Sequence, residues 1–389
     1  MDIHAKIAAD HDEMTEWRRA LHEQPETAFE EVNTSAFVAE KLESFGIRVE
    51  RGLAGTGVVG IIEGKDPGSR AIGLRADMDA LDIYEQTNKP YASKIPGKMH
   101  ACGHDGHTTM LLGAAKYLAE TRDFSGTAYM IFQPAEENEG GGRVMVEEGL
   151  FDKYPMEQVY GMHNWPGVPV GRIGMRAGPI MASYDIFEIK VTGKGSHGAM
   201  PHEGIDPVLI ASHIVTNLQT IASRNVDPLE SVVVSTTQIH GGDAYNVVPQ
   251  EVELKGTVRS FKPDVQDMAE AHIKRIAKSV AAAHGGEADV HYERRYPPTV
   301  NEPDATLQAE KIANGLVGAE NVDTDVTPVM GSEDFAFMLE HKPGSYIWLG
   351  AGEDSANLHS PHFDFNDEIL PIGASYWARL VEETLPASR

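Results

Sequence analysis

The stretch MHACGHDGHTTM, residues 99–110, constrains this chain most strongly, because it places three histidines and the only cysteine within eight residues. Gly103 and Gly106 interrupt the cluster and give the backbone the freedom that a sharp turn needs. Apolar residues recur at helical spacing from Thr108 onward, which predicts a helix beginning there. A strand is predicted upstream, at 71–74. The cluster should therefore lie where a strand gives way to a helix in an α/β fold.

Cys102 and His104 each have an ordinary explanation when taken alone. A single cysteine is often a small buried hydrophobic residue, and a single histidine is often a surface or hydrogen-bonded core residue. Thiolate and imidazole two residues apart, however, suit zinc, manganese, cobalt or nickel. The pair therefore favours a metal site, provided that the fold brings further ligands to it.

Further residues of metal-binding type follow other predicted strands. Glu136 and Glu137 come after an apolar strand at 128–132, His163 follows a strand at 158–162, and His359 lies in a loop after a strand at 346–349. Two adjacent glutamates are often only a solvated pair. At the end of a strand, their side chains diverge, so one carboxylate can bind metal while the other faces a water molecule. The sequence thus predicts that these residues join the cysteine and histidine.

The order of predicted elements divides the chain into two domains. Strands and helices alternate up to about residue 180, as in α/β folds. From about 183 to 296 the order becomes β-α-β-β-α-β, which is that of a ferredoxin-like unit. Beyond Pro297 the α/β pattern resumes, with one helix expected from Glu333 to Leu339 and capped by Ser332. We therefore expect one domain at 1–180 and 298–389, and an inserted domain at 181–297.

Composition narrows the range of partners and compartments. The net charge of −26 argues against nucleic acid and against anionic membrane surfaces. No run approaches the ~20 apolar residues that cross a bilayer, and the amphipathic, acidic start MDIHAKIAADHDEMTEW differs from a signal or transit peptide. A single cysteine forbids an internal disulfide, in agreement with a reducing compartment. These features predict a cytoplasmic protein.

Six ordered motifs then identify a family resemblance: WRRALHEQPETAFEE, HACGHDGH, QPAEE, GMHNWPG, GSHGAMPHEGIDP and HSPHFDFND. Together they resemble the amidohydrolase branch of the aminoacylase and glutamate-carboxypeptidase metallopeptidases, which includes hippurate hydrolases, N-acyl-amino-acid amidohydrolases and auxin-conjugate hydrolases. The resemblance covers essentially the whole chain. It implies a catalytic domain with a mixed central sheet flanked by helices, and an inserted ferredoxin-like α+β domain that acts as a lid and dimer contact.

The resemblance also implies roles for the residues of the predicted cluster. It makes five of them ligands of a centre of two divalent metal ions per subunit, which would be zinc, manganese, cobalt or nickel; these are Cys102, His104, Glu137, His163 and His359. Glu136 is implied to be the general base for a metal-activated water. Asp77 is implied to orient a histidine ligand, although a carboxylate that caps a turn at a strand end is nearly as plausible.

Other implied residues lie in the inserted domain. By resemblance, Asn246, Arg259 and His202 serve the substrate, and His197 reaches an active site, in several relatives that of the partner subunit of a homodimer. Without the family, each signal is weak. A histidine in a glycine-rich loop is commonly a surface turn residue, and an arginine near a strand end is commonly a solvated charge.

The sequence therefore predicts a metal-dependent amidohydrolase that cleaves N-acyl-L-amino acids, with hippurate-like or acetyl acyl groups, to a carboxylate and a free amino acid. Two alternatives remain at this stage. One is a dipeptidase or exopeptidase of the same superfamily. The other is a non-catalytic homologue that keeps the metal for binding, although the presence of Glu136 beside the ligands argues against it.

Overall fold

The computed structural model describes residues 3–137 and 139–387, and within them the chain forms two compact units. Unit 1 comprises Met1–Ile180, Val300–Thr327 and Asp334–Arg389, and unit 2 comprises Met181–Thr299 and Pro328–Glu333. The sequence analysis had placed 328–333 in the catalytic domain. This segment belongs to unit 2 because the Ala182 N–H donates to the carbonyls of Val329 and Gly331, at 3.1 and 2.9 Å.

Unit 1 is built on an eight-stranded mixed sheet with the order β1-β2-β4-β3-β5-β16-β6-β15. The central pairs β4/β3, β3/β5 and β5/β16 are parallel, whereas β1/β2, β2/β4 and β16/β6 are antiparallel. The strands are β1 Arg48–Arg51, β2 Val58–Glu63, β3 Asp66–Asp77, β4 Ser125–Gln133, β5 Gln158–Pro166, β6 Ile173–Gly174, β15 Val322–Asp323 and β16 Gly344–Gly352.

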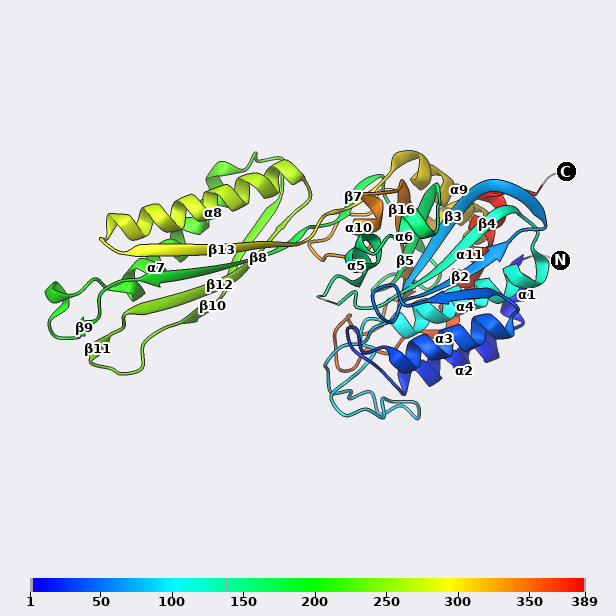
Figure 1. Cartoon of the computed structure of the whole chain (residues 1–389), viewed down its shortest axis with the longest axis horizontal. Coiled ribbons are helices and arrows are strands. Elements are labelled where there is room, and N and C mark those ends of the chain that lie inside the picture. Colours follow the sequence, from blue (N-terminus) through cyan, green and yellow to red (C-terminus); the bar gives the residue numbers. More distant parts are fainter. Residues whose placement is uncertain (1–2, 138, 388–389) are drawn as a thin grey trace. The chain divides into compact units, whose positions relative to one another are not determined.

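Helices flank this sheet (Figure 1). They are α1 Ile3–Ala8, α2 His11–His22, α3 Val32–Ser44, α4 His104–Thr121, α5 Gly141–Glu147, α6 Leu150–Lys153, α9 Pro303–Val317, α10 Ala336–Leu339 and α11 Leu370–Thr384. The second half of β3 is buried without interruption, as expected for a parallel strand covered on both faces. α4 is buried along almost its whole length and contacts α2, α3 and α11. The expected mixed central sheet flanked by helices is therefore confirmed.

Unit 2 contains a four-stranded antiparallel sheet with the order β10-β12-β8-β13. Its elements are β8 Tyr184–Thr192, β9 Ser196–His197, α7 Pro207–Leu218, β10 Val232–His240, β11 Val247–Val248, β12 Glu251–Ser260, α8 Pro263–Ala283 and β13 Glu287–Tyr296. Burial along β8 alternates, because α7 and α8 cover one face of the sheet (Figure 1). This strand order and chain order are those of a ferredoxin-like fold.

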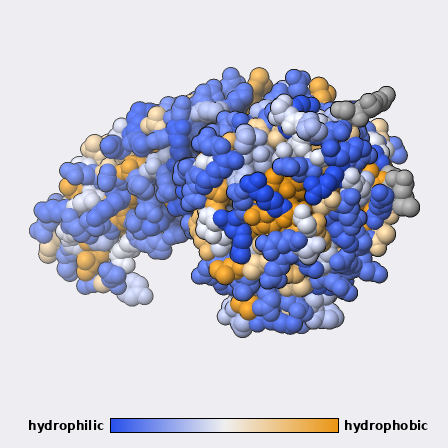
Figure 2. Space-filling model, turned by 45° about the vertical axis from the view of Figure 1, so that its right-hand side comes forward, coloured by the Kyte–Doolittle hydropathy of each residue, from blue (hydrophilic) through white to orange (hydrophobic). Residues whose placement is uncertain are grey.

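Each unit has its own hydrophobic core. The face of the molecule in Figure 2 is mostly hydrophilic, in keeping with the net charge of −26. None of the helices in the described part of the chain has the length and apolar character needed to cross a bilayer.

Candidate metal centre and active site

The predicted metal ligands gather at the edge of unit 1 where the parallel strands end. His163 lies near the end of β5, Glu136 and Glu137 follow β4, and His104 is the first residue of α4. This helix begins at His104, whereas the sequence analysis expected Thr108. The carbonyl of Gly103 already accepts the N–H of His107 at 3.0 Å, so His104 lies in the first helical turn and Cys102 just before it.

One group of potential ligands consists of Cys102, His104 and His163. Their ligand atoms lie within 4.8 Å of one another, and Cys102 Sγ is 3.3 Å from His163 Nε2. All three side chains are buried. A thiol and two imidazoles at such separations form a typical set of zinc or other transition-metal ligands.

A second group shares Cys102 and adds Glu137 and His359, again with ligand atoms within 4.8 Å. His359 Nε2 is 3.1 Å from Glu137 Oε1, and its backbone N–H donates to the Ala101 carbonyl at 2.8 Å. The side chain of His359 remains 53% exposed. The loop after β16 thus supplies the most exposed of the predicted ligands. Because Cys102 belongs to both groups, ions held by the two groups would be neighbours.

The hydrogen bonds of the two buried histidines suit metal binding. His163 Nδ1 donates to its neighbour's carbonyl at 2.7 Å, and His104 Nδ1 lies 3.2 Å from Asp79 Oδ1. Metal-binding histidines commonly donate their second N–H in this way. His104 Nε2 is then buried without a hydrogen-bond partner among the described residues. A buried ring nitrogen that makes no hydrogen bond and lies beside a thiol and carboxylates, with Asp77 Oδ2 3.8 Å away, fits a metal ligand.

The electrostatics around Cys102 also fit a cation. Burial, followed by the nearby charges of Glu137 and Glu136, raises the pKa of this thiol well above its usual value. Burial lowers the pKa of His104, but the charges of Asp77 and Asp79 outweigh it and raise the pKa to about 10. A site with this much negative charge suits a divalent cation, which would replace the thiol and imidazolium protons.

Asp79, to which the sequence analysis gave no role, makes the contact expected of Asp77. Besides facing His104, its two oxygens accept the backbone N–H groups of Glu136 and Glu137, at 3.0 and 2.9 Å. Asp77 instead lies 2.6 Å from Nδ1 of His107, a histidine outside the predicted ligand set. A pattern of two aspartates in RADMD could have suggested both residues but not how they divide these contacts.

Asp77 belongs to a buried network behind the ligands. Arg75 donates to Asp77 and Asp334 at 2.7 and 2.8 Å, while His107 Nε2 lies 2.6 Å from Asn164 Oδ1. Burial opposes ionisation, but His104, His107 and Arg75 hold the pKa of Asp77 well below its usual range. His107 and Asn164 were missed as site residues, because only the fold shows that they connect the ligand-bearing segments.

Glu136 lies beside the predicted metal ligands but belongs to neither of the two groups described above. It is 7% exposed, and one of its oxygens accepts the Asp334 N–H at 3.4 Å. A carboxylate oxygen of Glu136 lies within 4.8 Å of ligand atoms of His104 and Glu137. A buried carboxylate at this position can accept a proton from a reacting water.

The remaining predicted residues lie in unit 2. His197 on β9 is exposed and its Nδ1 accepts the Ala199 N–H at 3.0 Å, and His202 and Asn246 are exposed as well. Arg259 on β12 is half-buried: its guanidinium stacks 4.2 Å over the Tyr184 ring and donates to Ser332. Burial lowers its pKa, and none of the described carboxylates forms an ion pair with it.

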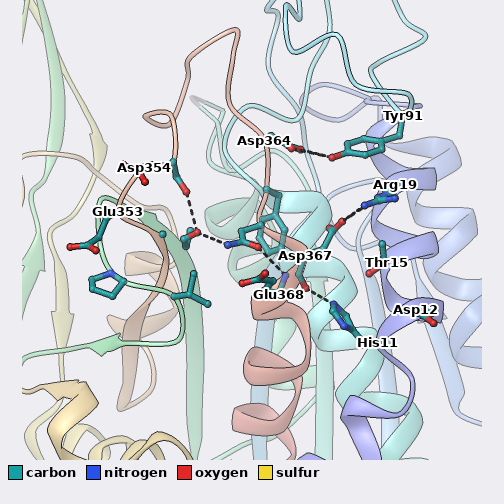
Figure 3. A pocket seen from close by; sticks show the side chains of 17 residues that line it. His11, Asp12, Thr15, Arg19, Tyr91, Glu353, Asp354, Asp364, Asp367 and Glu368 are labelled. Atoms are coloured by element: carbon teal, nitrogen blue, oxygen red, sulfur yellow. Dashed lines mark hydrogen bonds and ion pairs between the residues drawn. The ribbon is translucent and has the colours of Figure 1, made fainter.

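A cavity of about 890 Å³ in unit 1 is a separate feature (Figure 3). None of the predicted metal ligands lines it, although it contains six carboxylates: Asp12, Glu353, Asp354, Asp364, Asp367 and Glu368. Asp367 is paired with Arg18 and Arg19, and Asp364 with Lys89. These carboxylates form no metal-ligand group within 3–137 and 139–387.

Comparison with known proteins identifies the family. The model of peptidase family M20/M25/M40 matches residues 73–383. The chain belongs to this family. It is 42% identical over 363 residues to the hippurate hydrolase of Campylobacter jejuni, covering 93% of this chain and 94% of that protein. It is also 40% identical to the N-acetylcysteine deacetylase of Bacillus subtilis, covering 95% and 96% of the two chains.

A solved structure supports the metal centre of this M20 chain. The YXEP protein of Bacillus subtilis, described as a dinuclear metal-binding peptidase of the M20 family, superposes with a TM-score of 0.85 at 36% identity, covering 97% of this chain and 99% of the other. The resemblance to the amidohydrolase branch is thereby confirmed, and the chain is a hydrolase of a metallopeptidase family.

Proposed function

We propose that this M20 hydrolase cleaves the amide bond of N-acyl-L-amino acids, releasing a carboxylate and a free amino acid. The observation that carries the proposal is the buried Nε2 of His104, which has no hydrogen-bond partner among the described residues and lies beside Cys102, with the carboxylate of Glu136 close by. Relatives at about 40% identity that are named as a hippurate hydrolase and an N-acetylcysteine deacetylase support this substrate class.

Two divalent ions would be held by five residues in this proposal: Cys102, His104, Glu137, His163 and His359. When bound, they would polarise the scissile carbonyl and make water a stronger nucleophile. Zinc, manganese, cobalt and nickel all suit mixed thiolate, imidazole and carboxylate ligands. Asp79 holds the His104 ring and the backbone of the two glutamates, so it fixes where these groups stand.

Glu136 carries the proton in the proposed reaction. It accepts a proton from the attacking water as the oxygen adds to the carbonyl carbon, and returns that proton to the nitrogen as the C–N bond breaks. In unit 2, Arg259 is assigned the substrate carboxylate, with Asn246 and His202 as further substrate contacts. By resemblance, the proposal also includes a homodimer and a role for His197 in the active site of the partner subunit.

The substitution Glu136→Gln tests the mechanism. The amide is nearly isosteric but cannot accept the proton, so kcat should fall about 10²- to 10⁴-fold, while metal content and thermal unfolding stay unchanged. Glu139→Gln, which neutralises an exposed glutamate nearby, is the matched control. Activity of Glu136→Gln within about threefold of wild type, ~0.7 kcal/mol in barrier, would remove Glu136 from the mechanism.

A substrate panel tests the specificity. We expect hippurate and N-acetyl amino acids to be cleaved with a higher kcat/KM than dipeptides. The opposite order would support the dipeptidase alternative, and no turnover of any member by the metal-loaded protein would support a binding role.

A further inference from the structure

The turn that carries Glu136 and Glu137 is held in a strained conformation. Ala135, fully buried, has φ +55, a left-handed conformation that is unfavourable for an L-residue with a Cβ. Its carbonyl accepts the Gly141 N–H at 2.8 Å, and a Cβ at Gly141 would lie only 1.8 Å from the Pro134 carbonyl oxygen. Such a conformation persists only where neighbouring groups hold it.

Three consecutive N–H groups of this turn point at carboxylates. Those of Glu136 and Glu137 donate to Asp79, as described above. The N–H of Ala135 donates to Oε1 of Glu31, at 2.9 Å, although Glu31 lies 104 residues away at the start of α3. The strained residue is therefore fixed by a side chain from a distant segment.

Glu31 is itself fixed in place. Its side chain is fully buried, its Oε1 also accepts the N–H of Phe29 at 3.0 Å, and its Oε2 accepts the Thr56 hydroxyl at 2.7 Å. No lysine, arginine or histidine among the described residues forms an ion pair with it. A buried carboxylate without a cation is costly, and burial raises the pKa of Glu31 to about 7. The three hydrogen bonds that Glu31 accepts, two of them from backbone N–H groups, hold it in a specific geometry.

We propose that Glu31 is a positioning residue for the reaction: by holding the N–H of Ala135, it sets where the carboxylates of Glu136 and Glu137 stand. The inference rests on the roles proposed for those two glutamates. It assigns Glu31 no contact with substrate. A small displacement of a catalytic group commonly costs up to about a hundredfold in rate, so the position of this turn matters for both proton transfer and metal binding.

Two conservative substitutions of Glu31 separate the effect of its side-chain length from the effect of its charge. Glu31→Gln keeps the length and leaves one oxygen that can accept both N–H groups, while its amide can donate to Thr56. Glu31→Asp keeps the charge but withdraws the oxygens by one methylene. We expect kcat of Glu31→Gln within about threefold of wild type, and kcat of Glu31→Asp lowered about ten- to a hundredfold with little change in KM. The control is Glu30→Asp at the neighbouring, exposed glutamate, which should behave as wild type.

Two further readouts distinguish positioning from general stability. Metal loss from the holoenzyme to EDTA should be at least threefold faster in Glu31→Asp than in wild type, because Glu137 is displaced. Adding Ala135→Gly to Glu31→Asp should restore part of kcat, since glycine adopts positive φ without strain. Thermal unfolding of each variant shows whether a decrease in kcat or a faster loss of metal comes only from misfolding.

The outcomes are distinct. If Glu31→Asp has the kcat and the rate of metal loss of wild type, or if Glu31→Gln is the slower enzyme of the two, the positioning role is wrong. A folded Glu31→Asp that Ala135→Gly does not rescue also contradicts it. The proposed function is tested separately: an active Glu136→Gln variant would contradict it, whatever the Glu31 variants show.

Discussion

At the scale of residues, two aspartates separated by a single methionine have different partners. Asp77 reaches His107 and Arg75 in the buried network, whereas Asp79 reaches His104 and the backbone of Glu136 and Glu137. The orientation of a metal-binding histidine should therefore depend on Asp79. Outer partners of this kind commonly contribute a factor of 10–100 in metal affinity.

The variant Asp79→Asn tests this role. An asparagine has only one oxygen, so it cannot accept from both backbone N–H groups and also hold the His104 ring with a negative charge. We expect metal loss from the holoenzyme to a chelator to become about 10- to 100-fold faster. Asp82→Asn removes an exposed charge from the same stretch and should leave the rate unchanged. Equal rates in both variants would show that Asp79 does not support the ligands.

Residue types and strand ends were enough to nominate the cysteine, histidines and glutamates that the structure brings together. They could not identify Glu31 or Asn164 as parts of the site, nor could they show which groups Asp79 contacts. The importance of these residues lies in single hydrogen bonds to distant segments, and such contacts leave no periodic or spacing signal in one sequence. His107 stands in the motif and Asp77 was itself a predicted site residue, but the sequence did not show that these two residues contact each other.

At the scale of elements, helix boundaries show where tertiary contacts override local pattern. The helix expected from Glu333, with Ser332 as its cap, begins only at Ala336. Asp334 is bound by Arg75 and by the Gly142 N–H, and the Ser332 hydroxyl accepts from Arg259. The succession of strands along the chain, by contrast, was predicted from apolar runs and turns, and the β-α-β-β-α-β succession expected for the inserted domain is confirmed.

The start of α4 gives a test at this scale. Gly103 has φ +99, and a Cβ there would lie 2.2 Å from the Asn164 side-chain oxygen. Gly167 has φ +80 with nothing within 4 Å of its Cβ position. Alanine at either site should lose ~1–2 kcal/mol of folding stability from the left-handed backbone, and Gly103→Ala should lose a further ~1–3 kcal/mol from the clash.

Thermal unfolding of the two glycine variants measures the difference. The larger decrease in Tm should belong to Gly103→Ala, together with loss of bound metal, because Cys102 and His104 flank the glycine. Equal decreases in the two variants would mean that the Asn164 side chain moves away from the new Cβ at no cost in stability. The close approach of Gly103 to Asn164 would then be unimportant.

At the scale of the whole molecule, the net charge of −26 poses a problem for a substrate with a free carboxylate. An acidic protein repels anions at long range, so binding needs a local cation, and a guanidinium offers a fork that matches a carboxylate. Arg259 is half-buried and stacked on Tyr184, with no described carboxylate paired to it. It is suited to receive a carboxylate from a ligand.

The variant Arg259→Ala, assayed on an N-acyl amino acid and on the corresponding amide, tests this assignment. Losing a charge-assisted hydrogen bond costs about 1.5–3 kcal/mol, so kcat/KM for the acid should fall roughly ten- to a hundredfold. The uncharged amide should be cleaved almost as well as by wild type. Arg275→Ala removes an exposed charge from the same unit and controls for the altered net charge. Equal losses on acid and amide would mean that Arg259 supports the structure of unit 2 through Tyr184 and Ser332, and that another group binds the carboxylate.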